Sequence, residues 1–304
     1  MRIGKKRYRL KKSVRRALYS ITGLALGLIC AINTNAVAAD TNVNIEEGRV
    51  SIEDYEYFKQ RSVVKVTMPS TVQQIGFSSF EGCQELSAIN LVDGLSVIDN
   101  RAFAKCTSLS HVDIPESTVF IGNAAFYGCE SLDNMVVPSG IRALSNNLFY
   151  GCKTLSNVTI PDSVTEIGQQ CFYNCVGLTQ IKLPASLQTI ADGAFYDCSS
   201  LKSLEIPDTV TNIGVDAFSG CDKLLIIADK DTYAYKYAKD NNLMVRSKGE
   251  SSTQVNQATT QVAKVNKPDV PATGVETHYL LMLILLMMSG AGLIRLGLLR
   301  EVSH

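Results

Sequence analysis

Residues 80–86 read FEGCQEL, and the pattern Phe-x-x-Cys-x-x-Leu in this stretch occurs seven times, once every 23 residues, without an insertion or a deletion. The phenylalanines are Phe80, Phe103, Phe126, Phe149, Phe172, Phe195 and Phe218. The cysteines are Cys83, Cys106, Cys129, Cys152, Cys175, Cys198 and Cys221, and the leucines are Leu86, Leu109, Leu132, Leu155, Leu178, Leu201 and Leu224. A fixed period of this length is typical of stacked units that bury their apolar faces only against one another. The sequence therefore predicts a solenoid whose function lies in its surface.

The coil that begins at Leu155 shows the internal pattern most fully. Val158 alternates with the polar residues Asn157 and Thr159, which predicts a short strand. Pro161 then ends the strand, because proline has no amide hydrogen to donate to a ladder. An aliphatic residue returns toward the core six residues later. We expect an α/β repeat solenoid of seven 23-residue coils with parallel strands over residues 63–228.

The repeated phrases Ile-Pro, Ile-Gly, Ala-Phe and Gly-Cys-x-x-Leu, from about Val63 to Ile227, resemble the BspA-like class of leucine-rich repeats. The Tyr-Ala-rich stretch from Tyr233 to Ala238 resembles the closing helix of that class. The resemblance implies a right-handed solenoid of parallel strands on a bacterial or protist surface, often suggested to be an adhesin. It implies no particular ligand.

Both ends of the array lose the repeat, which is expected because an open terminal coil would expose an apolar edge. Residues 39–62 carry an acidic, aromatic stretch that we interpret as an N-terminal cap. Residues 229–246 contain a helix-forming stretch that ends at Asn241 and Asn242, and we interpret them as the C-terminal cap.

The N-terminal residues 1–38 have the composition of a secretory signal peptide. Nine lysine and arginine residues precede Ala17, an apolar run follows to about Ile32, and Ala36 and Ala38 stand where a signal peptidase would cut. An uncleaved membrane anchor is the alternative, although the apolar run is shorter than the roughly 20 residues of a span.

The C-terminal part is predicted to attach the protein to the cell wall. Residues 247–269 are polar and without a periodic apolar face, which indicates a disordered spacer. Residues 270–304 then combine a short motif, an apolar run from about Tyr279 to Leu299 and a basic tail, an order that resembles the Leu-Pro-x-Thr-Gly sorting signal of Gram-positive surface proteins. The motif residues are Val270, Pro271, Ala272, Thr273 and Gly274.

The resemblance implies that a sortase cleaves after Thr273 and joins its carboxyl to peptidoglycan. Val270 departs from the commonest motif, which has leucine at that position, and Glu301 dilutes the basic tail. A plain C-terminal transmembrane anchor is the alternative, because a run of this length can span a bilayer.

The charge balance argues against a nucleic-acid partner. Between Ala39 and Thr273, 18 lysine and arginine residues oppose 27 aspartate and glutamate residues, so this part carries a net charge of −9. Binding to phosphates needs a basic patch instead.

The cysteines are predicted to be buried, reduced and structural. An in-register column spaces its side chains about 4.8 Å apart along a line, which suits neither a tetrahedral metal site nor disulfides between coils. Cys171 is close enough in sequence to pair with Cys175, but a small residue in place of the usual alanine is the simpler interpretation. We therefore expect no metal and no cofactor.

No catalytic constellation is evident in the sequence. His278 and His304 lie in the C-terminal signal, which leaves His111 alone in the repeat region. No nucleophile, base and orienting group recur around it, so the chain is predicted not to be an enzyme.

Two outward columns are candidate ligand-binding surfaces. The first is a tyrosine column that follows the repeat phenylalanines, at Tyr127, Tyr150, Tyr173 and Tyr196. Such a ridge could bind sugars or apolar protein surfaces, or its rings could simply pack on one another. The second is a polar column on the predicted strands, at His111, Asn134, Asn157 and Gln180, which either binds a protein by hydrogen bonds or is only solvated.

Together these patterns predict a secreted, non-enzymatic adhesion or protein-interaction module on a Gram-positive cell wall. Its partners would be the sortase, peptidoglycan and a protein or glycan ligand, and it would meet the membrane only through the C-terminal segment before processing. A structural or self-associating envelope protein, possibly anchored in the membrane, is the alternative.

Overall fold

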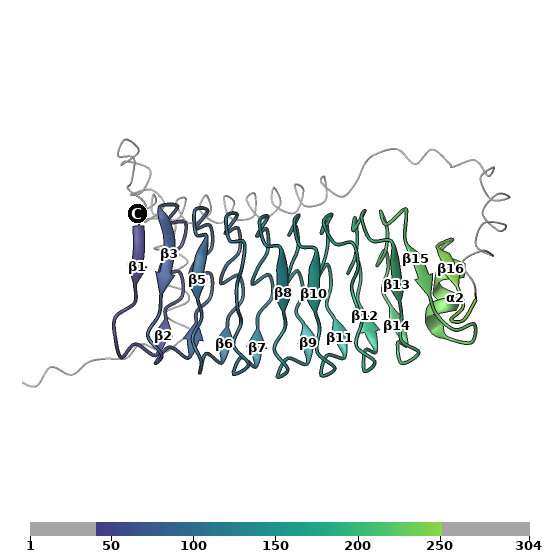
Figure 1. The fold of residues 1–304 in the computed structure, drawn as a ribbon, viewed down its shortest axis with the longest axis horizontal. Coiled ribbons are helices and arrows are strands. Elements are labelled where there is room, and N and C mark those ends of the chain that lie inside the picture. Colours follow the sequence, from purple (N-terminus) through teal and green to yellow (C-terminus); the bar gives the residue numbers. More distant parts are fainter. Residues whose placement is uncertain (1–40, 251–304) are drawn as a thin grey trace, which may run out of the picture. The chain divides into compact units, whose positions relative to one another are not determined.

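The computed structural model describes residues 41–250 (Figure 1). The predicted signal peptide with Ala36 and Ala38 lies outside the described residues, as do the spacer beyond residue 250 and the sorting signal of residues 270–304, which includes its apolar run. In the part of the chain that is described, no helix is long and apolar enough to span a membrane.

The described residues form a parallel β solenoid of about nine turns of roughly 23 residues each, which confirms the predicted repeat solenoid of parallel strands. The seven predicted coils are those with the Phe-x-x-Cys-x-x-Leu pattern, and the solenoid continues beyond them. One side carries the longer strands β1 (Thr41–Asn44), β3 (Val63–Thr67), β5 (Ala88–Asn90), β8 (Asn134–Val136), β10 (Asn157–Thr159), β13 (Ser203–Glu205), β15 (Leu225–Ile227) and β16 (Met244–Arg246). These strands pair in the orders β1-β3-β5, β10-β8 and β13-β15-β16.

The second side carries two-residue strands, which run along the lower edge of the solenoid in Figure 1. They are β2 (Ser51–Ile52), β4 (Gln74–Ile75), β6 (Val97–Ile98), β7 (Phe120–Ile121), β9 (Ala143–Leu144), β11 (Glu166–Ile167), β12 (Thr189–Ile190) and β14 (Asn212–Ile213). They pair in the orders β2-β4-β6-β7 and β14-β12-β11-β9. Ile167 of β11 pairs with Leu144 on one side and Ile190 on the other, so equivalent residues of successive coils stand in register.

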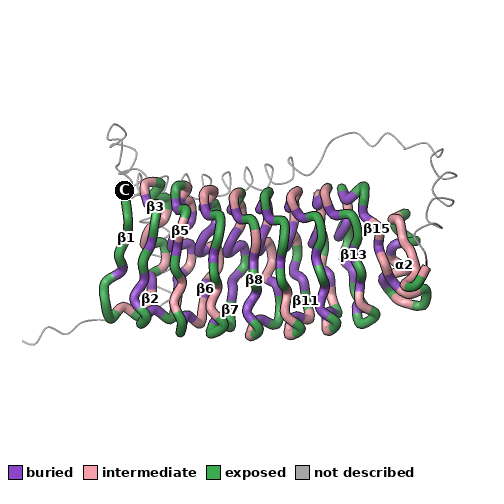
Figure 2. Tube along the Cα trace, viewed as in Figure 1, coloured by how far each residue is buried: buried purple, intermediate pink, exposed green. Residues whose placement is uncertain are grey.

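The third side of each coil consists of tight turns around the repeat phenylalanine. The seven phenylalanines are buried and stack along the solenoid, with ring centroids 5.1–6.0 Å apart and planes within 20° of parallel. Buried segments recur in every coil along the tube in Figure 2. The core is therefore one continuous column that runs the length of the repeat array.

Tyrosines close this column at both ends. Tyr57 stacks on Phe80 with centroids 5.1 Å apart, and it belongs to a first turn whose strands β1 and β2 pair with β3 and β4. At the other end Tyr237 of helix α2 (Tyr233–Asp240) meets Phe218 edge-on at 6.3 Å and donates its hydroxyl to the carbonyl of Gly214. Tyrosine suits these positions because its ring covers the core while its hydroxyl finds a polar partner.

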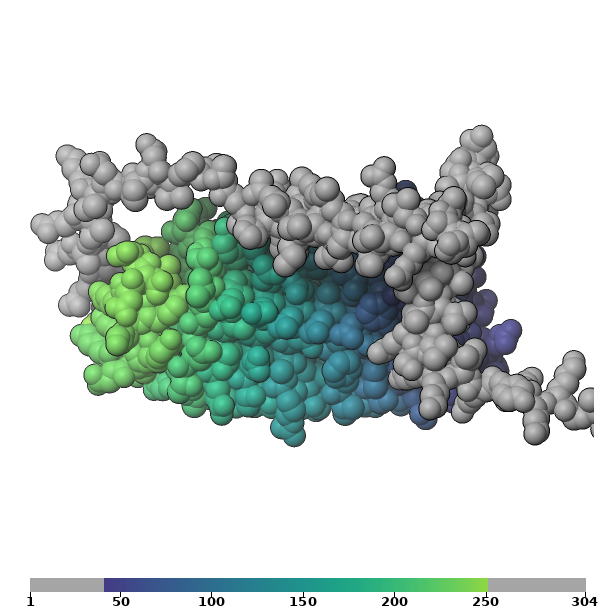
Figure 3. Space-filling model, turned by 180° about the vertical axis from the view of Figure 1, so that it is seen from behind, coloured from purple at the N-terminus to yellow at the C-terminus, as the bar shows by residue number. Residues whose placement is uncertain are grey.

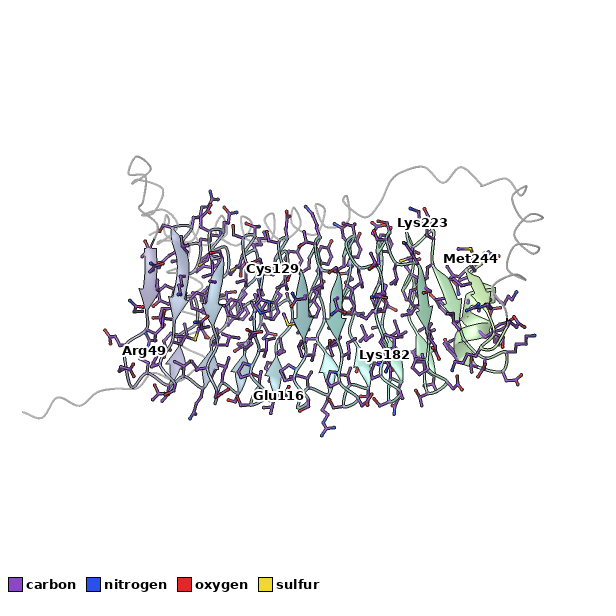
Figure 4. All side chains as sticks on the ribbon, viewed as in Figure 1. Arg49, Glu116, Cys129, Lys182, Lys223 and Met244 are labelled. Carbon is purple, nitrogen blue, oxygen red and sulfur yellow. The ribbon has the colours of Figure 1, made fainter. Side chains whose placement is uncertain are left out.

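The cysteine thiols join each coil to the one before it. All eight cysteines in the described residues are free and buried, as predicted, and Cys129 is labelled in Figure 4. Each thiol of the repeat column lies 3.0–3.2 Å from the carbonyl oxygen of the aromatic residue 26 positions earlier, to which it donates. The cysteine is thus more than a small apolar residue, because it satisfies a buried carbonyl that would otherwise lack this donor.

This burial predicts a loss of stability at alkaline pH. Burial raises the pKa of the Cys129 and Cys175 thiols from 9.0 to about 12. Unfolded thiols lose their protons above pH 9 while native thiols keep theirs, so the stabilisation is complete below pH 9 and is lost as the pH rises toward 12. Denaturant unfolding under reducing conditions should give a clearly lower midpoint at pH 10 than at pH 7.5. Equal midpoints, or fast labelling of the native thiols at neutral pH, would contradict the burial of the column.

Glycine alternates with larger residues at one position of the coil, next to a second contact between coils. Gly76, Gly122, Gly168 and Gly214 stand in every second coil, and the intervening coils have Asp99, Ser145 and Ala191 at that position. The next residue in the intervening coils is Asn100, Asn146 or Asp192, whose side-chain oxygen accepts from the backbone N–H of the following coil at 2.7–2.9 Å. Asn123, which follows Gly122, accepts in the same way from the backbone N–H of Asn146 at 3.1 Å, so this contact is not confined to the intervening coils.

Candidate functional site

The third side of the solenoid carries the tyrosine column on a rigid backbone. The residues two before and two after each repeat phenylalanine have positive φ, for example Asn147 at 56° and Gly151 at 70° around Phe149. This geometry turns the chain sharply, so that Phe149 is buried and Tyr150 beside it is half-buried. The same conformation in every coil places the tyrosines one above another.

The four tyrosine rings stack on each other. The centroids of Tyr127 and Tyr150 are 4.7 Å apart, those of Tyr150 and Tyr173 are 4.5 Å apart, and those of Tyr173 and Tyr196 are 4.7 Å apart. The planes are within 16° of parallel. Burial raises the pKa of the Tyr173 hydroxyl. The inner rings have a neighbour on each face, so they offer a ligand their edges and hydroxyls rather than their faces.

An ion pair covers the N-terminal end of the tyrosine stack. The guanidinium carbon of Arg101 lies 5.9 Å from the centroid of the Tyr127 ring. The same guanidinium binds the buried Glu81 carboxylate through Nε at 2.9 Å and Nη2 at 2.5 Å, and Ser78 donates its hydroxyl to that carboxylate at 2.6 Å. At the opposite end the coil that follows Tyr196 has Ser219 at the equivalent position, which is too small to cover the ring.

The residues around the inner tyrosines are uncharged. We define the tyrosine surface as the four tyrosines together with the amide side chains of Asn123, Asn146, Asn147, Gln169, Gln170 and Asn174 and the glycine Gly128. Tyrosine, amides and glycine are the residues that antibody paratopes favour, because they supply contact area and hydrogen bonds at a small cost in conformational entropy. At these positions charged residues occur only in the coils at the two ends, and the nearest charges of the inner coils are the exposed ion pair of Glu130 with Lys153, three residues beyond Tyr127 and Tyr150.

The predicted polar column is less continuous. Asn134 of β8 and Asn157 of β10 pair in register, but His111 and Gln180 lie on segments that are not strands. His111 is exposed, and its Nε2 lies 2.9 Å from the carboxylate of Asp113 in its own coil. Asn134 donates to its neighbour Asp133 at 2.6 Å. Only Asn134 and Asn157 of this column therefore lie on paired strands, whereas the rings of all four tyrosines stack on one another.

No group of three or more histidine, cysteine, aspartate or glutamate side chains in residues 41–250 is arranged to hold a metal ion.

Seen from behind, the coils lie side by side in chain order (Figure 3).

The comparison with family models identifies the repeat. The model of the BspA type leucine rich repeat region matches residues 50–176 and 119–238, with six copies. The chain belongs to the BspA-type leucine-rich repeat family. No curated protein matches it.

Solved structures similar to this family member include a leucine-rich repeat protein of T. pallidum, at 29% identity and a TM-score of 0.44, covering 68% of this chain and 84% of that chain. A leucine-rich cell surface protein of Faecalibacterium prausnitzii is 20% identical with a TM-score of 0.42, covering 72% of this chain and 90% of that chain. The pneumococcal vaccine antigen PcpA is 22% identical with a TM-score of 0.39, covering 60% of this chain and 55% of that chain.

Sequence reasoning missed two features of the site. One is the ion pair of Arg101 with Glu81, whose partners stand 20 residues apart, in neighbouring coils. The other is the amide frame of the tyrosine surface, although its signal is readable, because Asn147 and Gln170 recur at the same position of successive coils.

Proposed function

We propose that this leucine-rich repeat protein is a non-enzymatic protein-interaction module, displayed on the cell surface, that binds through the tyrosine surface. The observation that carries this proposal is the continuity of that surface, in which four stacked tyrosines extend over neighbouring coils and amide side chains flank the inner rings. The solenoid holds these side chains in fixed positions, so that binding costs little ordering entropy.

A protein partner fits this surface better than a sugar. Sugars typically lie flat on an aromatic face, but the inner ring faces here are covered by neighbouring rings 4.5–4.7 Å away. The accessible groups are phenol edges, hydroxyls and amides, which can exchange hydrogen bonds with a polar protein surface.

Adhesion of cells that display the full chain tests this proposal. Gln170→Arg should abolish adhesion, because it brings an unpaired charge into the uncharged centre of the surface. The substitution is compatible with the backbone, since Arg101 already occupies the same position of its coil at φ 58° against 53° for Gln170. Thr159→Arg, on exposed β10, is the matched control and should leave adhesion unchanged. The opposite pattern would assign binding to the strand side, and adhesion that does not depend on the protein would refute the proposal.

We further propose that the C-terminal segment links the protein covalently to the wall through Thr273. The support is the order of a motif, an apolar run and a basic tail in the sequence. Thr273→Ala should convert a protein released only by a peptidoglycan hydrolase into one extracted by detergent. If detergent alone releases the unmodified protein, the segment is a simple membrane anchor.

A further inference from the structure

The charge along the third side changes sign from one end of the tyrosine surface to the other. Arg101, whose charge is compensated by the Glu81 carboxylate that it binds, and the exposed Lys105 lie before the stack, in the coil of Phe103. Asp192, Asp197 and Asp216 lie at the other end, in the coils of Phe195 and Phe218. The coils between these ends, those of Phe126, Phe149 and Phe172, contribute only tyrosine, amide, alanine and glycine side chains at the same positions.

The charges of the two outermost coils are placed symmetrically about the centre of the tyrosine stack, whereas Asp192 and Asp197 lie one coil closer to it. That centre lies between Tyr150 and Tyr173. The coils of Phe103, Phe126 and Phe149 lie on one side of it, and those of Phe172, Phe195 and Phe218 lie on the other. Arg101 and Asp216 hold the same position in these two outermost coils. A two-fold axis through the centre, perpendicular to the solenoid, would therefore bring each cationic end against the anionic end of a second copy.

We propose that the partner of the tyrosine surface is a second copy of this chain, bound antiparallel about that two-fold axis. The inference rests on the proposed function and names its partner. A two-fold interface uses the same surface on both copies and must be complementary to itself. The central coils meet this condition with phenol and amide groups that both donate and accept hydrogen bonds, and the ends meet it by opposite charge.

The stacked rings also favour association. Each inner tyrosine is held between neighbours, so it loses little rotamer freedom when a partner covers its edge. Lys105 contributes an exposed cation, and Asp216 an exposed carboxylate that already accepts from the Ser219 hydroxyl at 2.8 Å. In the antiparallel pair, the coil that carries Lys105 in one copy faces the coil that carries Asp216 in the other copy.

The antiparallel arrangement has a consequence for cells. The described chain ends at residue 250, beyond α2, at the C-terminal end of the solenoid. Two antiparallel copies direct these ends in opposite directions, which suits copies that are displayed on two different cells. The same surface would then support adhesion between cells that carry the same protein.

Sedimentation of the purified full chain in mild detergent, over a range of concentrations, tests the pairing. Lys105→Glu and Asp216→Lys should each weaken self-association at least about tenfold, because each puts like charges in contact at two symmetric places. Mixing the two variants should restore association, since each unlike pair then regains opposite charges. Both positions have left-handed backbone, at φ 60° and 54°, and lysine already occupies this conformation at Lys59 and Lys105. Lys182→Glu, an exposed position on the strand side (Figure 4), is the control with the same charge change and should leave association unchanged.

Restoration by mixing supports the pairing, because misfolding of either variant would not be reversed by adding the other. A full chain that stays monomeric at every concentration overturns the inference, and so does association that neither charge change weakens. If the chain does not pair but cells still adhere to another partner, and Gln170→Arg abolishes that adhesion, the proposed function is retained. Loss of adhesion to every partner, with pairing intact, would instead refute the proposed function alone.

Discussion

Phe149→Ala is expected to lower the free energy of unfolding by about 3–5 kcal/mol, the range for buried aromatic residues that are cut to alanine. Phe149 is 1% exposed, and its ring lies between Phe126 at 6.0 Å and Phe172 at 5.5 Å. The truncation removes two ring contacts and leaves a cavity in the middle of the column. Because each coil packs only on its neighbours, the loss should extend to the adjacent coils and broaden the unfolding transition.

Phe120→Ala is the matched control for this prediction. Phe120 lies on the two-residue strand β7 with 45% of its surface exposed, so the same chemical change should cost less than about 1 kcal/mol. Denaturant unfolding followed by circular dichroism measures both variants. Equal effects would mean that the phenylalanine column is not the core of the solenoid.

Gly168→Ala is expected to lower the free energy of unfolding by about 1–3 kcal/mol, as for other additions to a closely packed site. A Cβ atom at Gly168 would lie 2.7 Å from the carbonyl oxygen of Leu144 and 2.9 Å from the backbone nitrogen of Asn146. Both atoms belong to the backbone of the preceding coil, so neither can rotate away. The added methyl group must therefore push the two coils apart.

Gly151→Ala separates this steric effect from backbone strain. Gly151 has φ +70°, and a Cβ there would come no closer than 3.9 Å to the neighbouring coil. Its substitution should cost about 1–2 kcal/mol through the left-handed conformation alone. The two variants differ in a second respect, because only Gly168→Ala should weaken the bond from the N–H of Gln169 to the Asn146 side chain, now 2.8 Å. Hydrogen exchange at Gln169 measures that difference, and unchanged protection in Gly168→Ala would show that the coils have room for the methyl group.

Much of the fold could be predicted from the sequence because the repeat is local and regular. The period of 23 residues places Phe149, Cys152 and Leu155 at the same point of every coil, and apolar residues at such positions are buried only if the coils stack. The tyrosine column followed from the same register. The surroundings of the tyrosine column could not be predicted in this way. The amides and the terminal charges are recognised as neighbours of the tyrosines only when the coils are placed in space.

The order of apolar residues along the chain thus determined the solenoid, its core columns and the outward position of the tyrosines. Tertiary structure alone decided how the coils touch. It showed that the ring faces of the tyrosines are occupied, that each thiol meets a carbonyl of the preceding coil, and that Gly168 packs against Leu144 and Asn146. The physical reason is that these contacts depend on distances of a few ångströms between backbones in neighbouring coils, and a pattern of residue types along one chain does not contain those distances.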